Sequence, residues 1–186
     1  MSKITRIPTA NLPYAEWVAL RKTLVYKGMV GGSDASTLLG LNPWTSKITR
    51  WNQSVGTANM KNIDNEIMFH GRLLEDYVAD LWQYWTGDPI EMIDNWEGGI
   101  PPYYIAQIQL YMLVLGYDYG QFAFLKDGRH MDVFTVEANQ NIQETILIEG
   151  EKFYNSVQEA RGIIDIEGVQ GNTNDAYRLV SHLEPD

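Results

Sequence analysis

The sequence predicts a helix-rich α+β protein with one small antiparallel sheet. Several segments repeat apolar residues at the helical spacings of three, four and seven. One pair of strand-like runs is joined by an Asp-Gly turn, and 186 residues that are 45% apolar can enclose one buried core. We therefore expect one domain over residues 1–162, followed by a C-terminal tail over residues 163–186.

The first predicted helix covers residues 14–26. Trp17, Leu20 and Leu24 form its apolar stripe. Pro13 stands near its start, where the missing N–H of proline costs nothing because the first turn has no intrahelical acceptor for it. This pattern predicts an amphipathic helix with one buried face.

Two short helices are expected next. Ser33 or Asp34 can cap the first of them, which runs through Leu39. The second covers residues 46–54 and is closed by Gly56, a residue that readily adopts the left-handed conformation at a helix end.

The strongest helical pattern lies over residues 63–85. Glu75 stands at the margin of its apolar stripe, where a carboxylate is half-sheltered from water. Residues 86–102 are polar and rich in helix breakers, and a helix resumes over residues 103–116 with Gln107 on its apolar side. The apolar stripe of the helix over residues 63–85 consists of Ile63, Ile67, Leu74, Val78, Leu81 and Trp85.

The last third of the chain contains the hairpin and a final helix. Residues 120–125 and 130–137 are the predicted strands, and residues 141–161 form the helix. The rest of the chain shows no clear period and is expected to be a loosely attached tail. Since a two-stranded hairpin is only marginally stable alone, the sheet looks incomplete.

Composition and charge restrict the functional classes. The absence of cysteine excludes disulfides and thiolate metal sites, and no apolar run has the length of a signal peptide core or a membrane span. We expect a cytoplasmic protein. The net charge is −10, yet residues 1–72 carry +5 and residues 73–186 carry −15. This split is compatible with an N-terminal part that faces phosphates, and equally with an uneven solvated surface.

Four stretches of the chain, taken in order, resemble one family. They are "EWVALRK...GGSDASTLLGLNPW", "GRLLEDYVADLW", "IPPYYIAQIQLYM" and "GRHMDVFTVEAN...EKFYNSV". With these stretches the chain is similar to the YqaJ-like viral recombinases, relatives of lambda exonuclease in the restriction-endonuclease-like nuclease superfamily. The resemblance implies a restriction-endonuclease-like core, here with a reduced central sheet.

The resemblance also implies an activity. Such enzymes are magnesium-dependent 5′ to 3′ exonucleases that act on linear double-stranded DNA and supply single strands to an annealing protein during phage recombination. It implies a phage-encoded protein in the bacterial cytoplasm, bound to double-stranded DNA ends, with a single-strand annealing protein as partner. Relatives that encircle DNA suggest a homo-oligomer.

Particular residues inherit roles from the resemblance. Ser33 would bind a DNA phosphate, and Glu75 would help to hold Mg²⁺ and a water molecule. Gln107, three positions after Tyr104 in a Tyr-x-x-Gln spacing, would orient the attacking water or a phosphate oxygen.

Basic side chains are the candidates for contacts with the DNA backbone. Lys47 and Arg50 are the main ones, and Arg21, Lys22 and Lys27 are further candidates. The alternative is a basic surface that faces only solvent. Most tryptophans and tyrosines lie on helix stripes, so core packing is favoured over base stacking. His70, His130 and His182 lack the spacing of a joint metal site.

The resemblance predicts that part of the catalytic machinery is missing. In relatives a metal-binding Asp and a Glu-x-Lys stand between the helix of the Glu75 counterpart and the later tyrosine-rich helix. Here the connection is "TGDPIEMIDNWEGG", which contains no lysine. We therefore expect the domain to be internally shortened near residues 86–99. Asp88, Glu91 and Asp94 are read as solvated acids in preference to replacement ligands.

Three functional interpretations follow. In the first interpretation, the chain is an exonuclease of this family that is impaired by the loss of catalytic strands, and we expect it to be inactive in hydrolysis. Alternatively, it is a catalytically inactive protein that binds DNA ends or a partner nuclease, or a deletion product without function. The lysine of Glu-x-Lys would offset charge that develops in the transition state, so its loss removes several kcal/mol of stabilisation.

Overall fold

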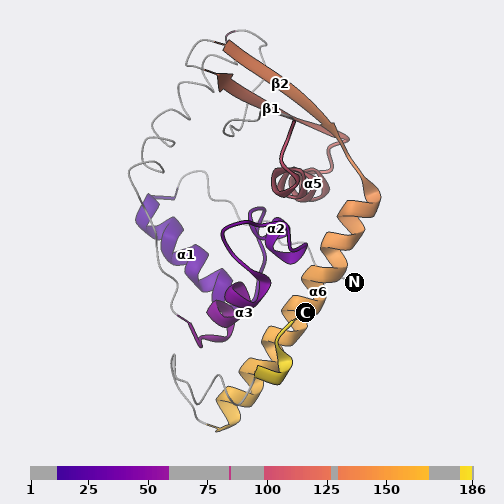
Figure 1. Cartoon of the computed structure of the whole chain (residues 1–186). Helices are drawn as coiled ribbons and strands as arrows, with labels where there is room; N and C mark the ends of the chain where they lie inside the picture. The colour runs from indigo at the N-terminus through magenta and orange to yellow at the C-terminus, as the bar shows by residue number, and fades with distance from the viewer. Residues whose placement is uncertain (1–11, 59–83, 85–98, 127–129, 168–180, 186) are drawn as a thin grey trace.

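The computed structural model describes residues 12–58, 84, 99–126, 130–167 and 181–185 (Figure 1). The predicted helix 63–85 and the predicted shortening near residues 86–99 lie outside these ranges, apart from residues 84 and 99. The elements are α1 (Tyr14–Tyr26), α2 (Asp34–Leu38), α3 (Lys47–Val55), α5 (Pro102–Leu115), β1 (Tyr119–Lys126), β2 (His130–Glu137), α6 (Gln140–Glu167) and the 3-10 helix η1 (Ser181–Leu183).

The structure confirms the predicted α+β class. In the described ranges the sheet consists of β1 and β2, which pair antiparallel from Tyr119 opposite Glu137 to Lys126 opposite His130. The helices and strands predicted over these ranges are present, and most of their ends agree within two residues. The described residues contain no helix that is both long and apolar enough to cross a membrane.

Local chemistry explains the ends of α3. The hydroxyl of Ser46 accepts a hydrogen bond from the Thr49 backbone N–H at 3.1 Å, which satisfies a donor of the first turn. Gly56 ends the helix in the left-handed conformation with φ of 86°, a conformation that glycine adopts without steric cost.

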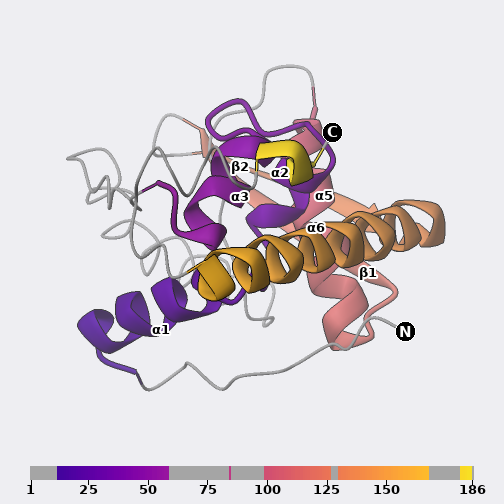
Figure 2. The same ribbon diagram turned by 90° about the horizontal axis from the view of Figure 1, so that it is seen from below.

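The helix α6 is the element on which the core is built (Figure 2). Helices α2, α3 and α5 all pack against it. One buried cluster lies between α6 and the α2–α3 pair, and a second lies between α6, α2 and α5. The first consists of Leu38, Trp51, Val55, Phe153, Val157 and Ala160, and the second of Ala35, Ala106, Leu110 and Ile146.

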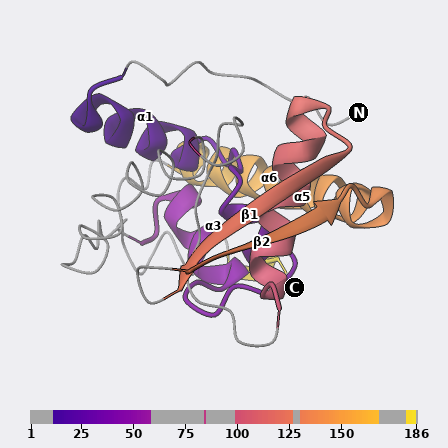
Figure 3. The same cartoon turned by 90° about the horizontal axis from the view of Figure 1, so that it is seen from above.

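The hairpin lies over the other side of α5 (Figure 3). Ile108 and Met112 of α5 and Phe122 of β1 form a third buried cluster there. Gly120 permits this close approach, because a Cβ at that position would lie 2.9 Å from Cγ1 of Ile108. The helix α5 therefore joins the hairpin to the rest of the core.

The end of the last helix differs from the prediction. The helix α6 continues to Glu167, six residues beyond its predicted end, and Leu183 of η1 packs against the first core cluster. The last residues before the terminus are anchored by this apolar contact, which no helical or strand period announces in the sequence.

Candidate functional site

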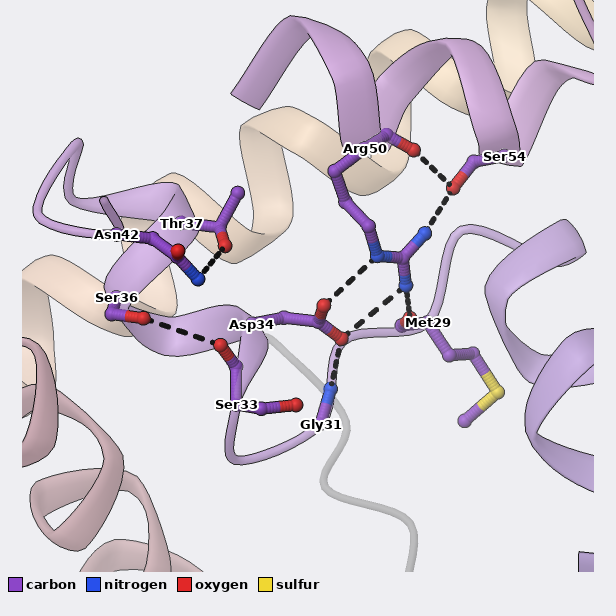
Figure 4. A network of polar contacts seen from close by, with 9 residues as sticks. All are labelled: Met29, Gly31, Ser33, Asp34, Ser36, Thr37, Asn42, Arg50 and Ser54. Atoms are coloured by element: carbon purple, nitrogen blue, oxygen red, sulfur yellow. Dashed lines mark hydrogen bonds and ion pairs between the residues drawn. The ribbon is translucent and has the colours of Figure 1, made fainter. Parts of the chain in front are cut away.

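The loop before α2 is held by one arginine (Figure 4). The Arg50 Nε donates to Asp34 at 2.9 Å, and its Nη2 donates to the other oxygen of that carboxylate at 3.3 Å and to the Met29 carbonyl at 2.8 Å. Its Nη1 donates to the Ser54 hydroxyl. The same Asp34 carboxylate accepts a hydrogen bond from the Gly31 backbone N–H at 2.9 Å, so Arg50 fixes the loop through Asp34.

The structure shows Arg50 engaged by partners within the chain, while its predicted phosphate contact stays a prediction. Its side chain is only 4% exposed, and its nitrogens donate to Asp34, Met29 and Ser54. Contact with DNA would require this buried pair to separate, which leaves a charge without its partner. Arg50 is a structural residue that positions the loop of residues 31–34.

Ser33 lies at the exposed tip of this loop. Its side chain does not cap α2, and its carbonyl accepts a hydrogen bond from the Ser36 hydroxyl at 3.2 Å. Asp34 supplies the side-chain bond to the loop instead, through Gly31. The Ser33 hydroxyl is thus presented to solvent from a loop of fixed shape, as a residue that contacts an external ligand must be.

Gln107 faces the same loop from α5. Its Nε2 donates to the Tyr111 hydroxyl at 3.0 Å, and the ring of Tyr111 lies directly against Gly32. A Cβ at Gly32 would collide with that ring, so the glycine is needed for this close approach. The structure therefore links Gln107, through Tyr111, to Gly32, the residue before Ser33, where α5 packs against α2.

The neighbouring glutamine, Gln109, has a different role that sequence reasoning missed. It is 1% exposed, its Nε2 donates to the Glu137 carbonyl at 2.8 Å, and its Oε1 accepts from the Asn139 N–H at 2.8 Å and from Gln143 at 3.2 Å. It joins α5 to the junction of β2 and α6. No signal in the sequence indicates this role, because Gln109 lies about 200° around the helix from Gln107, away from the side predicted to be apolar.

Lys47 is also occupied by a partner within the chain. Its ammonium lies 3.1 Å from Glu149 of α6, and Glu149 accepts a second bond from Lys152 at 2.8 Å. Hydrogen bonds from Lys152 and Lys47 lower the pKa of Glu149 below its ordinary value of 4.5. The Lys47 side chain is 19% exposed, and its ion pair with Glu149 joins α3 to α6.

The remaining basic candidates lie on α1. Arg21, Lys22 and Lys27 are all exposed, and the Arg21 guanidinium lies over the Trp17 ring at 5.4 Å from its centroid. Among the basic candidates, these three side chains are the more exposed to solvent.

The predicted metal ligand and the acids of the junction are not described. Glu75, Asp88, Glu91 and Asp94 all fall outside the described ranges. Within those ranges, no three His, Asp or Glu side chains gather as a metal site requires. Mg²⁺ therefore stays an expectation from the family.

The chain is similar in sequence and in fold to known proteins. Residues 16–95 match the YqaJ-like viral recombinase domain. A curated relative, "Uncharacterized protein YqaJ" of Bacillus subtilis (strain 168), is 27% identical in a match that covers 75% of this chain and 55% of the relative. The chain thus spans about half the length of that relative.

In sequence, the chain is similar to the YqaJ-like viral recombinases. The alignment with the Bacillus relative is 180 positions long. It includes 75% of the 186 residues of this chain, about 140 residues, so about 40 aligned positions have no residue in this chain. The fold agrees as well. The crystal structure of LHK-Exo in complex with dAMP superposes with a TM-score of 0.63 at 15% identity, over 83% of this chain and 97% of that chain.

Proposed function

We propose that this chain binds the ends of double-stranded DNA while its hydrolysis of the phosphodiester bond is impaired. One observation carries the binding: the ion pair of Asp34 with the buried Arg50 fixes a loop that presents the Ser33 hydroxyl to solvent, and Tyr111, which accepts from Gln107 of α5, lies against Gly32 of that loop. A hydroxyl on a preorganised loop can donate to a phosphate oxygen without the cost of ordering the loop on binding. The dAMP complex of the related fold is compatible with a nucleotide ligand.

The impaired chemistry rests on the sequence. Residues 86–99 contain no lysine, and about 40 positions of the match to the Bacillus relative lack a counterpart here. A shortened segment without Glu-x-Lys would leave Gln107 and Glu75 without the groups that stabilise the charge of the transition state. Mg²⁺ held by Glu75, a partner annealing protein, a homo-oligomer and a place in phage recombination remain parts of this proposal that derive from the family.

Binding and hydrolysis are tested separately with the full chain. We expect it to bind a linear blunt duplex more tightly than a closed circular duplex, with an affinity that falls as salt rises. Ser33→Ala should weaken end binding about tenfold or more, because a hydrogen bond to a charged group is lost. Gln121→Ala, a change of an exposed side chain on β1, is the matched control and should bind as the parent does.

Hydrolysis is followed as Mg²⁺-dependent digestion of the same linear duplex. We expect no digestion by the parent chain and no change on Glu75→Ala. Robust digestion that Glu75→Ala abolishes would contradict the impaired chemistry and restore a full exonuclease. Equal binding of linear and closed duplexes would contradict the recognition of ends.

A further inference from the structure

Trp44 is a large apolar side chain that the core does not use. It lies in the loop between α2 and α3 and is 71% exposed, whereas Trp51, seven residues later, is fully buried. Core packing, which the sequence favours for the tryptophans, therefore fails at Trp44. Such an exposed indole is available to contact a ligand.

The loop presents Trp44 in a fixed position. The Asn42 side-chain oxygen accepts hydrogen bonds from the backbone N–H groups of Trp44 at 2.9 Å and Thr45 at 3.1 Å. The amide nitrogen of Asn42 donates to the hydroxyl of Thr37 at 3.0 Å, and Thr37 is 2% exposed within α2. The loop is thus tied to the buried part of α2, so a ligand of Trp44 meets a preorganised surface.

Tyr103 supports the indole from one direction only. The two ring centroids lie 5.0 Å apart at an interplanar angle of 78°, the edge-to-face arrangement. In that arrangement Tyr103 covers at most one face of the indole. The ring of Tyr104 lies 4.4 Å from Tyr103 and 6.4 Å from Phe122 of the core, so the aromatic contact is anchored in the protein interior.

One face of α5 connects Trp44 to the proposed DNA site. Tyr103, Gln107 and Tyr111 follow one another at intervals of four residues and therefore share that face. Tyr111 contacts the loop of Ser33, and Tyr103 contacts Trp44. Eight residues of helix span about 12 Å, a distance that one strand of a stacked duplex covers in about four nucleotides and an extended single strand in fewer.

We propose that Trp44, supported by Tyr103, is a stacking platform for a nucleobase of the DNA strand whose phosphate lies at Ser33. This inference rests on the proposed function and extends it to unpaired bases. Stacking on an aromatic ring tolerates any sequence, because every base has a π face. The neighbouring Leu41 and Ile48 are 41% and 43% exposed and would suit a protein partner, but the row along α5 favours the nucleobase.

The experiment measures fluorescence anisotropy of labelled duplexes that carry a single-stranded overhang of about four nucleotides, with the full chain. Trp44→Ala should weaken binding to the overhang duplex by about 5-fold to 150-fold, the range expected for one stacked base. Trp44→Phe should recover most of the loss because it keeps an aromatic face. Tyr154→Ala removes a ring that is 44% exposed on α6 and should bind as the parent does.

A second duplex, with abasic sites in the overhang, separates stacking from a structural effect. The parent should lose affinity for the abasic overhang, and Trp44→Ala should not lose more, because the base and the ring act as one contact. Additive losses, or a parent that binds both overhangs equally, would overturn the inference while end binding at Ser33 stands. Failure of the parent to bind any duplex would overturn the proposed function and the inference together.

Sedimentation of the same variants tests the competing occupant. One outcome would be a parent dimer that Trp44→Ala dissociates, together with equal binding of the abasic and the intact overhang. In that case the surface around Trp44 binds a second copy of the chain, and the nucleobase proposal is wrong.

Discussion

Removal of Arg50 should destabilise the protein strongly and disturb the loop of Ser33. The substitution Arg50→Met keeps much of the aliphatic volume but removes the guanidinium. Asp34, the Met29 carbonyl and the Ser54 hydroxyl each lose a donor, and the guanidinium also leaves the Phe153 ring, whose centroid lies 5.8 Å away.

The magnitude follows from burial. Removing one partner of a buried ion pair costs about 3–5 kcal/mol. Arg50 is 4% exposed but Asp34 is 18% exposed, so water can reach the orphaned carboxylate in part, and we expect about 3 kcal/mol, the lower end of the range. For a chain of 186 residues this lowers the Tm by roughly 6–12 °C.

The assay is urea unfolding followed by circular dichroism, with a double-mutant cycle. Asp34→Asn alone should also destabilise the fold, and in the double variant the two losses should fail to add by about 1–3 kcal/mol, as for residues in one network. Lys152→Met is the control, since that ammonium pairs with Glu149 while its side chain is 69% exposed, and it should cost less than about 1 kcal/mol.

Two results would refute this reasoning. A loss below about 1 kcal/mol for Arg50→Met would show that the pair contributes no more than a surface ion pair. Full additivity with Asp34→Asn would show that the two side chains stabilise the fold independently. Arg50→Lys adds a geometric test, since lysine keeps the charge but cannot donate to two carboxylate oxygens and Met29 from one planar fork.

Two further predictions concern α5 and the ion pairs of α6. Gln109→Leu should lower the free energy of unfolding by about 1–3 kcal/mol, because the Glu137 carbonyl and the Asn139 N–H lose their partner. Gln107→Leu, at a half-buried position, should cost less than about 1 kcal/mol in the same urea titration, and equal losses would contradict the division of roles. Because Lys152 and Lys47 lower the pKa of Glu149, its stabilisation is present above about pH 4.5 and is lost as the pH falls through the lowered pKa. Glu149→Gln should therefore be less stable than the parent at neutral pH by up to about 1 kcal/mol, and the difference should shrink in acid. If the difference in the free energy of unfolding between parent and Glu149→Gln grows in acid, the pKa of Glu149 is not lowered by folding.

The order and type of the described elements were predictable because their signals are local. The apolar stripe of residues 14–26, the cap at Ser46 with Gly56, and the Asp-Gly turn between the strands each act within a few residues of the chain. The family was recognisable for a similar reason, since its motifs are contiguous stretches. The end of α6 and the packing of Leu183 were missed, because an apolar contact with a distant core leaves no period in the sequence.

The roles of similar side chains were decided by the tertiary structure. Arg50 and Lys47 look like two exposed cations of a short helix, yet their partners are Asp34, sixteen residues earlier, and Glu149, more than a hundred residues later. Such long-range pairs satisfy a charge inside the protein and remove it from the surface available to DNA.

The same division separates the glutamines and the tryptophans. By itself, the sequence determined that the chain has helices, a hairpin and motifs that resemble the YqaJ-like viral recombinases, without a Glu-x-Lys between residues 86 and 99. Only the fold decided that Gln109 joins elements while Gln107 faces the loop of Ser33, and that Trp51 is buried while Trp44 is exposed. The physical reason is that periodicity determines which face of a helix is apolar, whereas burial depends on what packs against that face.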